Sequence, residues 1–149
     1  MSKYDCLKLE NQLCFPLYAC SKAITKHYKP SLDELDLTYT QYITMMVLWE
    51  KKSANVSDLG KCLYLDSGTL TPVIKKLEAK GYITKTRSKD DERSVIVEIT
   101  AEGVKLRDKA VKIPSMMGGC VNISEKEATE LYKILYKILG HFDELDGGK

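Results

Sequence analysis

The spacing of apolar and polar residues along the chain predicts a mostly helical protein with one short pair of β-strands. Two runs rich in β-branched residues, 82–86 and 95–100, favour strands. Elsewhere apolar residues recur every three or four positions, which is the spacing of amphipathic helices. These helices are expected from Leu7 to about Tyr28, from Thr38 through Trp49, from Asn55 or Ser57 to Leu63, from Asp66 or Ser67 to Gly81, from Thr100 to about Val111, and from Ser124 onward.

Capping residues mark several of these helix ends. Thr38 with Gln41, and Ser124 with Glu127, have the three-residue spacing of a capping box. Gly81 follows the last apolar residue of its helix and can adopt the left-handed conformation that ends many helices.

Prolines and glycines predict interruptions. Pro16 lies inside the first predicted helix and is expected to kink it, and Pro30 is expected to help end it. The helix that begins at Thr100 is expected to stop near Pro114, and Ser115–Gly119 then predicts a loop.

The helix between Asp66 and Gly81 has two chemically different faces. One face is apolar, whereas the other carries small hydroxyls first and lysines later. That order suits a helix inserted N-terminus first into a DNA groove, with hydroxyls near base edges and lysines near phosphates. An ordinary amphipathic surface helix has the same pattern, so this helix alone does not distinguish a DNA-binding helix from a surface helix. The residues predicted to face DNA are Asp66, Ser67, Thr69, Thr71, Pro72, Lys75 and Lys76.

The segment after this helix favours DNA binding. The two predicted strands flank a charged turn at residues 87–94, and a helix followed by a basic hairpin is the layout of a winged helix. Arg87, Lys89 and Arg93 of this wing can reach phosphates or the minor groove. Residues 72–89 hold six Lys or Arg against one Glu, a net charge of +5, whereas the whole chain has +2. The positive charge is therefore concentrated where a duplex would lie.

Composition limits the class of protein. A chain of 149 residues with 44% hydrophobic and 30% charged residues predicts a single globular domain, residues 1–149. No apolar run approaches the roughly 20 residues that span a bilayer, and the first residues lack a signal core, so a cytoplasmic protein without a membrane partner is expected. Five cysteines and two histidines have no zinc-site or disulfide-scaffold spacing, so no metal or cofactor is expected.

The terminal helices are more apolar than a small winged lobe needs. Such helices usually bury their exposed stripe against a second copy of the chain. We therefore expect a homodimer formed by helices 7–29 and 100–146, with a winged helix-turn-helix at residues 38–99. A two-fold dimer presents two recognition helices to a palindromic operator in double-stranded DNA.

Two segments carry a family resemblance. Residues from Leu63 to Thr100, especially Tyr-Leu-Asp-Ser-Gly-Thr-Leu-Thr-Pro and Asp-Asp-Glu-Arg-Ser, resemble the winged helix of MarR-type repressors. Asp91 and Arg93 match acidic and basic wing-tip positions of that family. The form with Pro72, and the stretch from Leu9 to Cys20, are similar to its organic-hydroperoxide sensors, the OhrR type. The resemblance implies a mainly α fold with a β-hairpin wing (α+β), dimeric through its N- and C-terminal helices.

The resemblance also implies that Cys14 is the oxidised residue, with the Tyr28 and Tyr39 hydroxyls of the partner subunit hydrogen-bonded to its sulfur. A thiol reacts with a peroxide as the thiolate, which hydrogen-bond donors stabilise. Tyr18 lies one helical turn from Cys14 on the same face. The alternative is that Cys14 is a small buried core residue, the usual fate of a free cysteine.

Cys120 is the second candidate thiol. In two-cysteine members of the resembled family, a cysteine in this region of the other subunit resolves the sulfenic acid, which implies a disulfide between Cys14 and Cys120 of opposite subunits. Alternatively, a low-molecular-weight thiol caps Cys14. Cys6, Cys20 and Cys62 are interpreted as bystanders.

Together these residues predict a redox-sensing repressor that binds its operator when reduced and releases it when organic hydroperoxide oxidises Cys14. One rival is a MarR-type repressor released by a small phenolic or apolar ligand. Another is a thiol peroxidase, but the wing, the basic stretch and the lack of an Arg near Cys14 disfavour an enzyme. The +5 stretch disfavours a dimeric adaptor without DNA binding, and activation at some promoters stays open.

Overall fold

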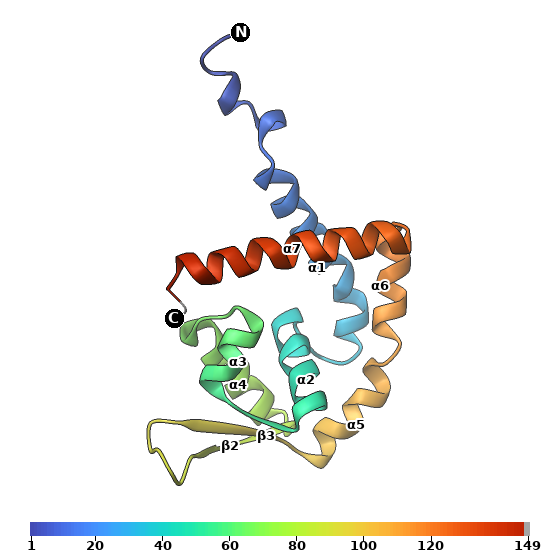
Figure 1. Ribbon diagram of the computed structural model, residues 1–149. Helices are drawn as coiled ribbons and strands as arrows, with labels where there is room; N and C mark the ends of the chain where they lie inside the picture. The colour runs from blue at the N-terminus through green and yellow to red at the C-terminus, as the bar shows by residue number, and fades with distance from the viewer. Residues whose placement is uncertain (148–149) are drawn as a thin grey trace. The chain divides into compact units, whose positions relative to one another are not determined.

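The computed structural model describes residues 1–147 and forms two compact units, Met1–Met117 and Gly118–Lys149. Its mainly helical composition with one small sheet confirms the predicted fold class (Figure 1). Two short 3-10 turns, Asp5–Leu7 and Leu9–Asn11, precede the helices. The elements are then α1 (Cys14–Asp33), α2 (Tyr39–Lys51), β1 (Ser53–Asn55), α3 (Val56–Leu63), α4 (Ser67–Ala79), β2 (Ile83–Arg87), β3 (Val95–Ile99), α5 (Ala101–Ala110), α6 (Ile113–Val121) and α7 (Glu125–Leu145).

The capping residues act where the sequence predicted. The Thr38 hydroxyl accepts from the Gln41 N–H at 3.3 Å, and the Gln41 side chain accepts from the Thr38 N–H at 3.1 Å. Ser124 and Glu127 form the same reciprocal pair before α7, at 3.1 and 2.9 Å. Gly81 has φ +83° after α4. These local signals therefore set the starts of α2 and α7 and the turn after α4.

The first helix begins at Cys14, so the predicted start at Leu7 is wrong. Pro16 consequently lies in the first turn, where a residue without an N–H breaks no helical hydrogen bond, and the reason for the predicted kink does not hold. Pro30 does not end the helix either, because α1 continues to Asp33. The extra turn buries Leu32, which is 2% exposed, and this burial offsets the cost of an internal proline.

The segment Ser115–Gly119, predicted to be a loop, lies inside α6. Pro114 is the second residue of this helix, a position that accepts proline. Ile113 and Met117 lie one turn apart and are both buried, which outweighs the cost of about 1 kcal/mol that a glycine carries in a helix. Cys120 therefore belongs to a helix and not to a loop.

The wing belongs to a three-stranded antiparallel sheet in the order β1-β3-β2. The sequence predicted β2 and β3 but missed β1, since a polar three-residue strand has no apolar alternation. Helices α2, α3 and α4 pack on this sheet.

The core lies between these helices and the sheet. Of the two adjacent methionines of α2, Met45 is buried in the core, whereas Met46 is 44% exposed. The most deeply buried side chains include Met45, Leu48, Leu59, Leu70, Leu77, Ile83 and Val97.

A close contact at Gly103 joins α2, the base of the wing and α5. The Trp49 indole N–H donates to the Gly103 carbonyl at 2.8 Å. The Thr100 hydroxyl donates to the Gly81 carbonyl at 2.6 Å and accepts from the Gly103 N–H at 3.1 Å. A side chain at Gly103 would place its Cβ 2.3 Å from the Tyr82 carbonyl oxygen. These contacts hold the winged lobe together as one body.

Two expectations about organisation stand apart from these contacts. The prediction of a single domain, made from chain length, stays a prediction. Within residues 1–147, no helix is both long and apolar enough to cross a bilayer.

Replacing Gly103 by Ala is expected to destabilise the protein by about 1–3 kcal/mol, because the added methyl group must displace backbone. Gly68→Ala is the matched control, since its Cβ meets only a carboxylate oxygen of Asp66 at 3.4 Å. Chemical denaturation at one fixed protein concentration measures both variants. Equal unfolding midpoints would contradict the close approach at Gly103.

Candidate functional site

Helix α4 turns its apolar face inward and its polar face outward, as predicted. Leu70, Val73, Ile74 and Leu77 are buried. Every residue predicted on its DNA face is exposed, namely Asp66, Ser67, Thr69, Thr71, Pro72, Lys75 and Lys76. A row of hydroxyls followed by ammonium groups is therefore accessible to a polyanion along this helix.

A tight turn joins α3 to α4. Tyr64 adopts a left-handed conformation with φ 56°, and the Leu65 N–H donates to the Gly60 carbonyl at 2.9 Å. A Cβ at Gly60 would lie 2.8 Å from the Leu65 carbonyl oxygen, so this turn requires glycine there. The result is a helix-turn-helix in which α4 is the second, exposed helix.

Asp66 shapes the start of α4. Its carboxylate accepts from the Thr69 N–H at 2.7 Å, so Asp66 is the N-cap of the two candidate helix starts, Asp66 and Ser67, that the sequence left open. This hydrogen bond holds the pKa of Asp66 below its ordinary value. The carboxylate therefore stabilises the helix end and stays ionised there.

The second turn of α4 is irregular. Pro72 lies in this turn, and it has no N–H to donate to the Gly68 carbonyl. The hydroxyl of the preceding residue, Thr71, donates to the Ser67 carbonyl, one turn back along the helix, at 2.7 Å. Thr71 and Pro72 thus shape the exposed backbone of the helix, whereas Lys75 and Lys76 carry its charge.

The wing tip is held by its own polar contacts. The Arg87 guanidinium donates to the Glu92 carbonyl at 2.7 Å, and an Asp91 carboxylate oxygen accepts from the Arg93 N–H at 3.0 Å. Arg87 makes this hydrogen bond within the turn and is itself exposed, so its predicted contact with DNA stays a prediction. Lys89 and Arg93 are exposed at the tip.

Cys14 is the first residue of α1, and its side chain is exposed. The alternative of a buried core cysteine is therefore wrong for this chain. Leu13 caps the helix without a side-chain hydrogen bond. The N-terminal amides of α1 consequently lie beside the sulfur.

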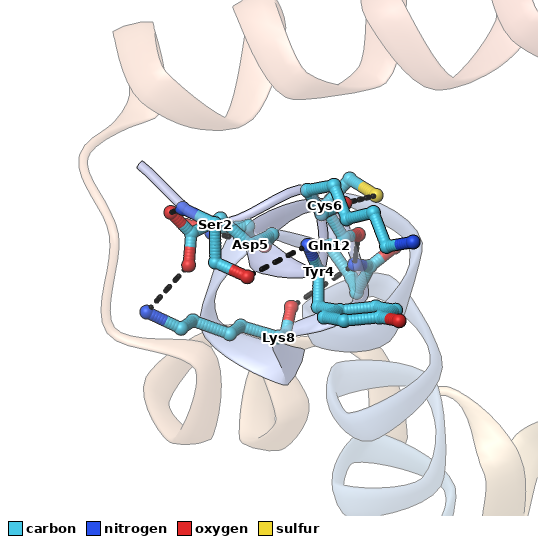
Figure 2. A network of polar contacts seen from close by, with 8 residues as sticks. Ser2, Tyr4, Asp5, Cys6, Lys8 and Gln12 are labelled. Atoms are coloured by element: carbon cyan, nitrogen blue, oxygen red, sulfur yellow. Dashed lines mark hydrogen bonds and ion pairs between the residues drawn. The ribbon is translucent and has the colours of Figure 1, made fainter.

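The segment before Cys14 is folded locally (Figure 2). The Lys8 ammonium lies 2.9 Å from an Asp5 carboxylate oxygen, and the other oxygen of Asp5 accepts from the Ser2 N–H at 3.1 Å. The Gln12 amide donates to the carbonyls of Cys6, at 2.6 Å, and of Lys8, at 3.0 Å. These contacts fix the backbone that leads into α1.

Three tyrosine rings pack where α1 meets α2. The ring centre of Tyr28 lies 5.0 Å from that of Tyr39 and 5.8 Å from that of Tyr42. Burial raises the pKa of all three phenols, and for Tyr28 the neighbouring Tyr39 adds to it. The hydroxyls therefore stay protonated and available as donors at neutral pH. The sequence identified Tyr28 and Tyr39 but missed Tyr42, whose position one turn after Tyr39 was the available signal.

The structure does not bring these phenols to Cys14 of the same chain. With a rise of about 1.5 Å per residue, Tyr28 lies about 21 Å along α1 from Cys14. Tyr18 is on the first turns of α1, 60% exposed, with the Lys22 ammonium 5.2 Å from its ring centre. Cys120 is exposed on α6. In residues 1–147, no group of three His, Cys, Asp or Glu is placed to hold a metal ion.

Comparisons with known proteins place this geometry in context. The sequence model of the family described as "Transcriptional regulator SarA/Rot" matches residues 26–110. An organic hydroperoxide resistance transcriptional regulator of Bacillus subtilis (strain 168) is 49% identical over 138 residues, 93% of this chain and 94% of that protein. A structure of the reduced form of AbfR of Staphylococcus epidermidis bound to DNA aligns with a TM-score of 0.77 and 29% identity, covering 95% of this chain and 99% of that one. The disulfide form of AbfR aligns with a TM-score of 0.65 and 29% identity, covering 92% and 96%.

The lowered pKa of Asp66 predicts a pH dependence of stability. A carboxylate with a depressed folded-state pKa stabilises the fold above its ordinary pKa of 3.8, and this contribution is lost as pH falls through the folded-state value. Asp66→Asn keeps a capping oxygen but does not titrate. Thermal melts across this pH range should show the difference between wild type and Asp66→Asn narrowing in acid. A difference independent of pH would contradict the assigned hydrogen bond.

Proposed function

The chain belongs to the SarA/Rot family of MarR-type transcriptional regulators, in the organic-hydroperoxide-sensing (OhrR) branch, and from this premise we propose that Cys14 switches its DNA binding. The reduced protein binds a palindromic operator as a homodimeric repressor. Oxidation of Cys14 by an organic hydroperoxide releases the operator. Since the family consists of regulators, the chain is not an enzyme, and the thiol peroxidase alternative is set aside.

The position of Cys14 carries this proposal. The sulfur is exposed at the first residue of α1, where a peroxide can reach it. The thiolate attacks the terminal oxygen of the hydroperoxide, and the O–O bond breaks. Cys14 is oxidised by two electrons to the sulfenic acid, while the peroxide is reduced to an alkoxide that takes a proton from solvent and leaves as the alcohol.

A second copy of the chain completes the site. Helix α7 has no buried residue among those described, and apolar side chains along both terminal helices are exposed. A homodimer buries such surfaces. In the resembled family the hydroxyls that stabilise the thiolate come from the partner subunit, and we assign the same role to Tyr28 and Tyr39 of the partner subunit here. The distance of Tyr28 from Cys14 within one chain agrees with this assignment. The exposed residues are Leu13, Phe15, Leu17, Ile24, Leu131, Tyr132, Ile134, Tyr136, Phe142 and Leu145.

Cys120 of the partner subunit is the resolving thiol in this proposal. Its sulfur attacks the sulfenic sulfur of Cys14, an S–S bond forms, and the sulfenic oxygen leaves as water. The exposure of Cys120 on α6 supports this role. A solved disulfide form of the related AbfR supports it as well.

Release follows from displacement of the phenols. A disulfide or a bulky adduct at Cys14 displaces Tyr28 and Tyr39 of the partner subunit, and Tyr39 is the first residue of α2. Helix α2 packs against α3 and α4, so its movement changes the separation of the two DNA-binding lobes in the dimer. Affinity then falls because both half-sites can no longer be contacted together.

Replacing Cys14 by Ser is expected to leave operator binding intact and to abolish release by cumene hydroperoxide, because the variant lacks the sensing sulfur. Gel shifts with and without the peroxide, followed by dithiothreitol, measure this. Cys20→Ser is the matched control on the same helix and should respond like wild type. Release of the operator by peroxide-treated Cys14→Ser protein would refute the sensing role.

Replacing Cys120 by Ser is expected to abolish a covalent dimer, since the sulfenic acid then lacks its protein thiol. Non-reducing electrophoresis of peroxide-treated protein tests this prediction. A dimer band that survives Cys120→Ser, or its absence from wild type, would rule out the intersubunit disulfide and leave capping by a small thiol.

Replacing Lys75 or Arg93 by Ala is expected to weaken DNA binding and to flatten its salt dependence. Each lost phosphate contact should reduce the magnitude of the slope of log affinity against log salt by about 0.9. Binding isotherms at several salt concentrations give the slopes. An unchanged slope would place that residue away from the phosphates.

A further inference from the structure

Lys80 differs from the other cations of the basic stretch because its side chain is half-buried, whereas theirs are exposed. Its side chain is only 25% exposed, and its ammonium nitrogen lies 3.4 Å from an Asp36 carboxylate oxygen. The same ammonium donates to the Asp36 backbone carbonyl, and to the Gln41 side-chain oxygen at 3.3 Å. We name these three residues the Lys80 clamp.

The acceptors of the Lys80 clamp lie at the junction of α1 and α2. Asp36 has φ 53°, and its neighbours Leu35 and Leu37 are buried, so its backbone position is well defined. Gln41 is 3% exposed, and the oxygen that accepts from Lys80 also accepts from the Thr38 N–H in the capping box of α2. The clamp therefore holds the very turn that begins with Tyr39.

The donor of the clamp lies at the C-terminal end of α4. Lys80 is the C-cap residue of α4, and its own N–H donates to the Lys76 carbonyl at 3.1 Å. The lysines proposed to contact phosphate, Lys75 and Lys76, lie on the preceding turn. The ammonium group of Lys80 therefore joins the α1–α2 junction directly to the last turn of α4.

We propose that Lys80 is a positioning residue that couples the tyrosine cluster to the recognition helix. While Tyr28 and Tyr39 are undisturbed, the clamp fixes α4 at the spacing that suits DNA. When oxidation displaces these phenols, the clamp carries the movement of the junction to α4. This inference rests on the proposed redox function, and it names the contact through which the two sites are linked. Coupling of this kind requires an element whose position both sites bias.

Four variants separate coupling from charge and from stability. Lys80→Met removes the ammonium but keeps an unbranched apolar chain, whereas Lys80→Arg keeps a cationic donor and should rescue. Lys85→Met is the matched control, because it removes the same charge from an exposed position in β2 of the same basic stretch. Asp36→Asn removes only the carboxylate partner, and asparagine tolerates the positive φ at that position.

The experiment measures the affinity of the full-length protein for a duplex that the reduced wild type selects from a random pool. Each variant is assayed reduced and after cumene hydroperoxide, at an extent of Cys14 oxidation matched by mass spectrometry. Wild type should lose roughly 5- to 150-fold on oxidation, the usual range of allosteric coupling, and the loss for Lys80→Met should be at least about fivefold smaller. Lys80→Arg should restore the loss. Lys85→Met should lower the affinity of the reduced and the oxidised protein by the same factor, so that the ratio of the two affinities stays at the wild-type value.

The outcomes distinguish the two proposals. If oxidised wild type keeps its affinity, the redox function itself fails. If wild type releases the duplex and Lys80→Met releases it equally, the redox function stands and the coupling role of Lys80 is wrong. Should Lys80→Met fail to fold or to bind DNA when reduced, Lys80→Gln decides, because it removes the ammonium group but keeps a polar side chain. If this variant binds DNA but loses less affinity on oxidation than wild type, the clamp is supported. If it loses as much affinity as wild type, the clamp is overturned.

Discussion

The packing of three tyrosine rings between the end of α1 and the start of α2 is the contact on which the rest of the structure depends. Tyr28 comes from the helix that begins at Cys14, whereas Tyr39 and Tyr42 come from the helix that supports the helix-turn-helix. Tilted aromatic pairs of this kind add to the stability gained from burial. The same rings keep two phenolic hydroxyls protonated, so one cluster both joins two helices and offers hydrogen-bond donors.

Beyond this cluster the winged lobe is held as one body. Trp49 links α2 to α5 through the Gly103 carbonyl, and Thr100 links α5 to the turn after α4. Lys80 links the end of α4 to the junction at Asp36. A displacement that begins at the rings therefore moves the recognition helix together with its surroundings, since closely packed interiors transmit strain and do not absorb it.

Features encoded by neighbouring residues could be predicted from the sequence, and features decided by tertiary contacts could not. The cap at Asp66, the turn at Gly81 and the wing are local signals, and the structure contains them. The start of α1 at Cys14 was missed because apolar spacing continues upstream of Pro16, although the backbone there forms 3-10 turns. Helix α6 was missed because its glycines argue for a loop, whereas burial of neighbouring side chains decides for a helix. Lys80 looked like one more surface cation, since its partners lie 44 and 39 residues away.

The central claim is that phenols of one subunit act on the sulfur of the other, and mixed dimers test it most directly. One subunit carries Cys14→Ser, and its partner carries Tyr28→Phe with Tyr39→Phe. In our account the remaining Cys14 then faces the intact Tyr28 and Tyr39 of the partner subunit, although its own chain lacks both. Our account predicts that cumene hydroperoxide oxidises this sulfur as fast as in wild type. Oxidation as slow as in the homodimer carrying Tyr28→Phe and Tyr39→Phe would contradict it.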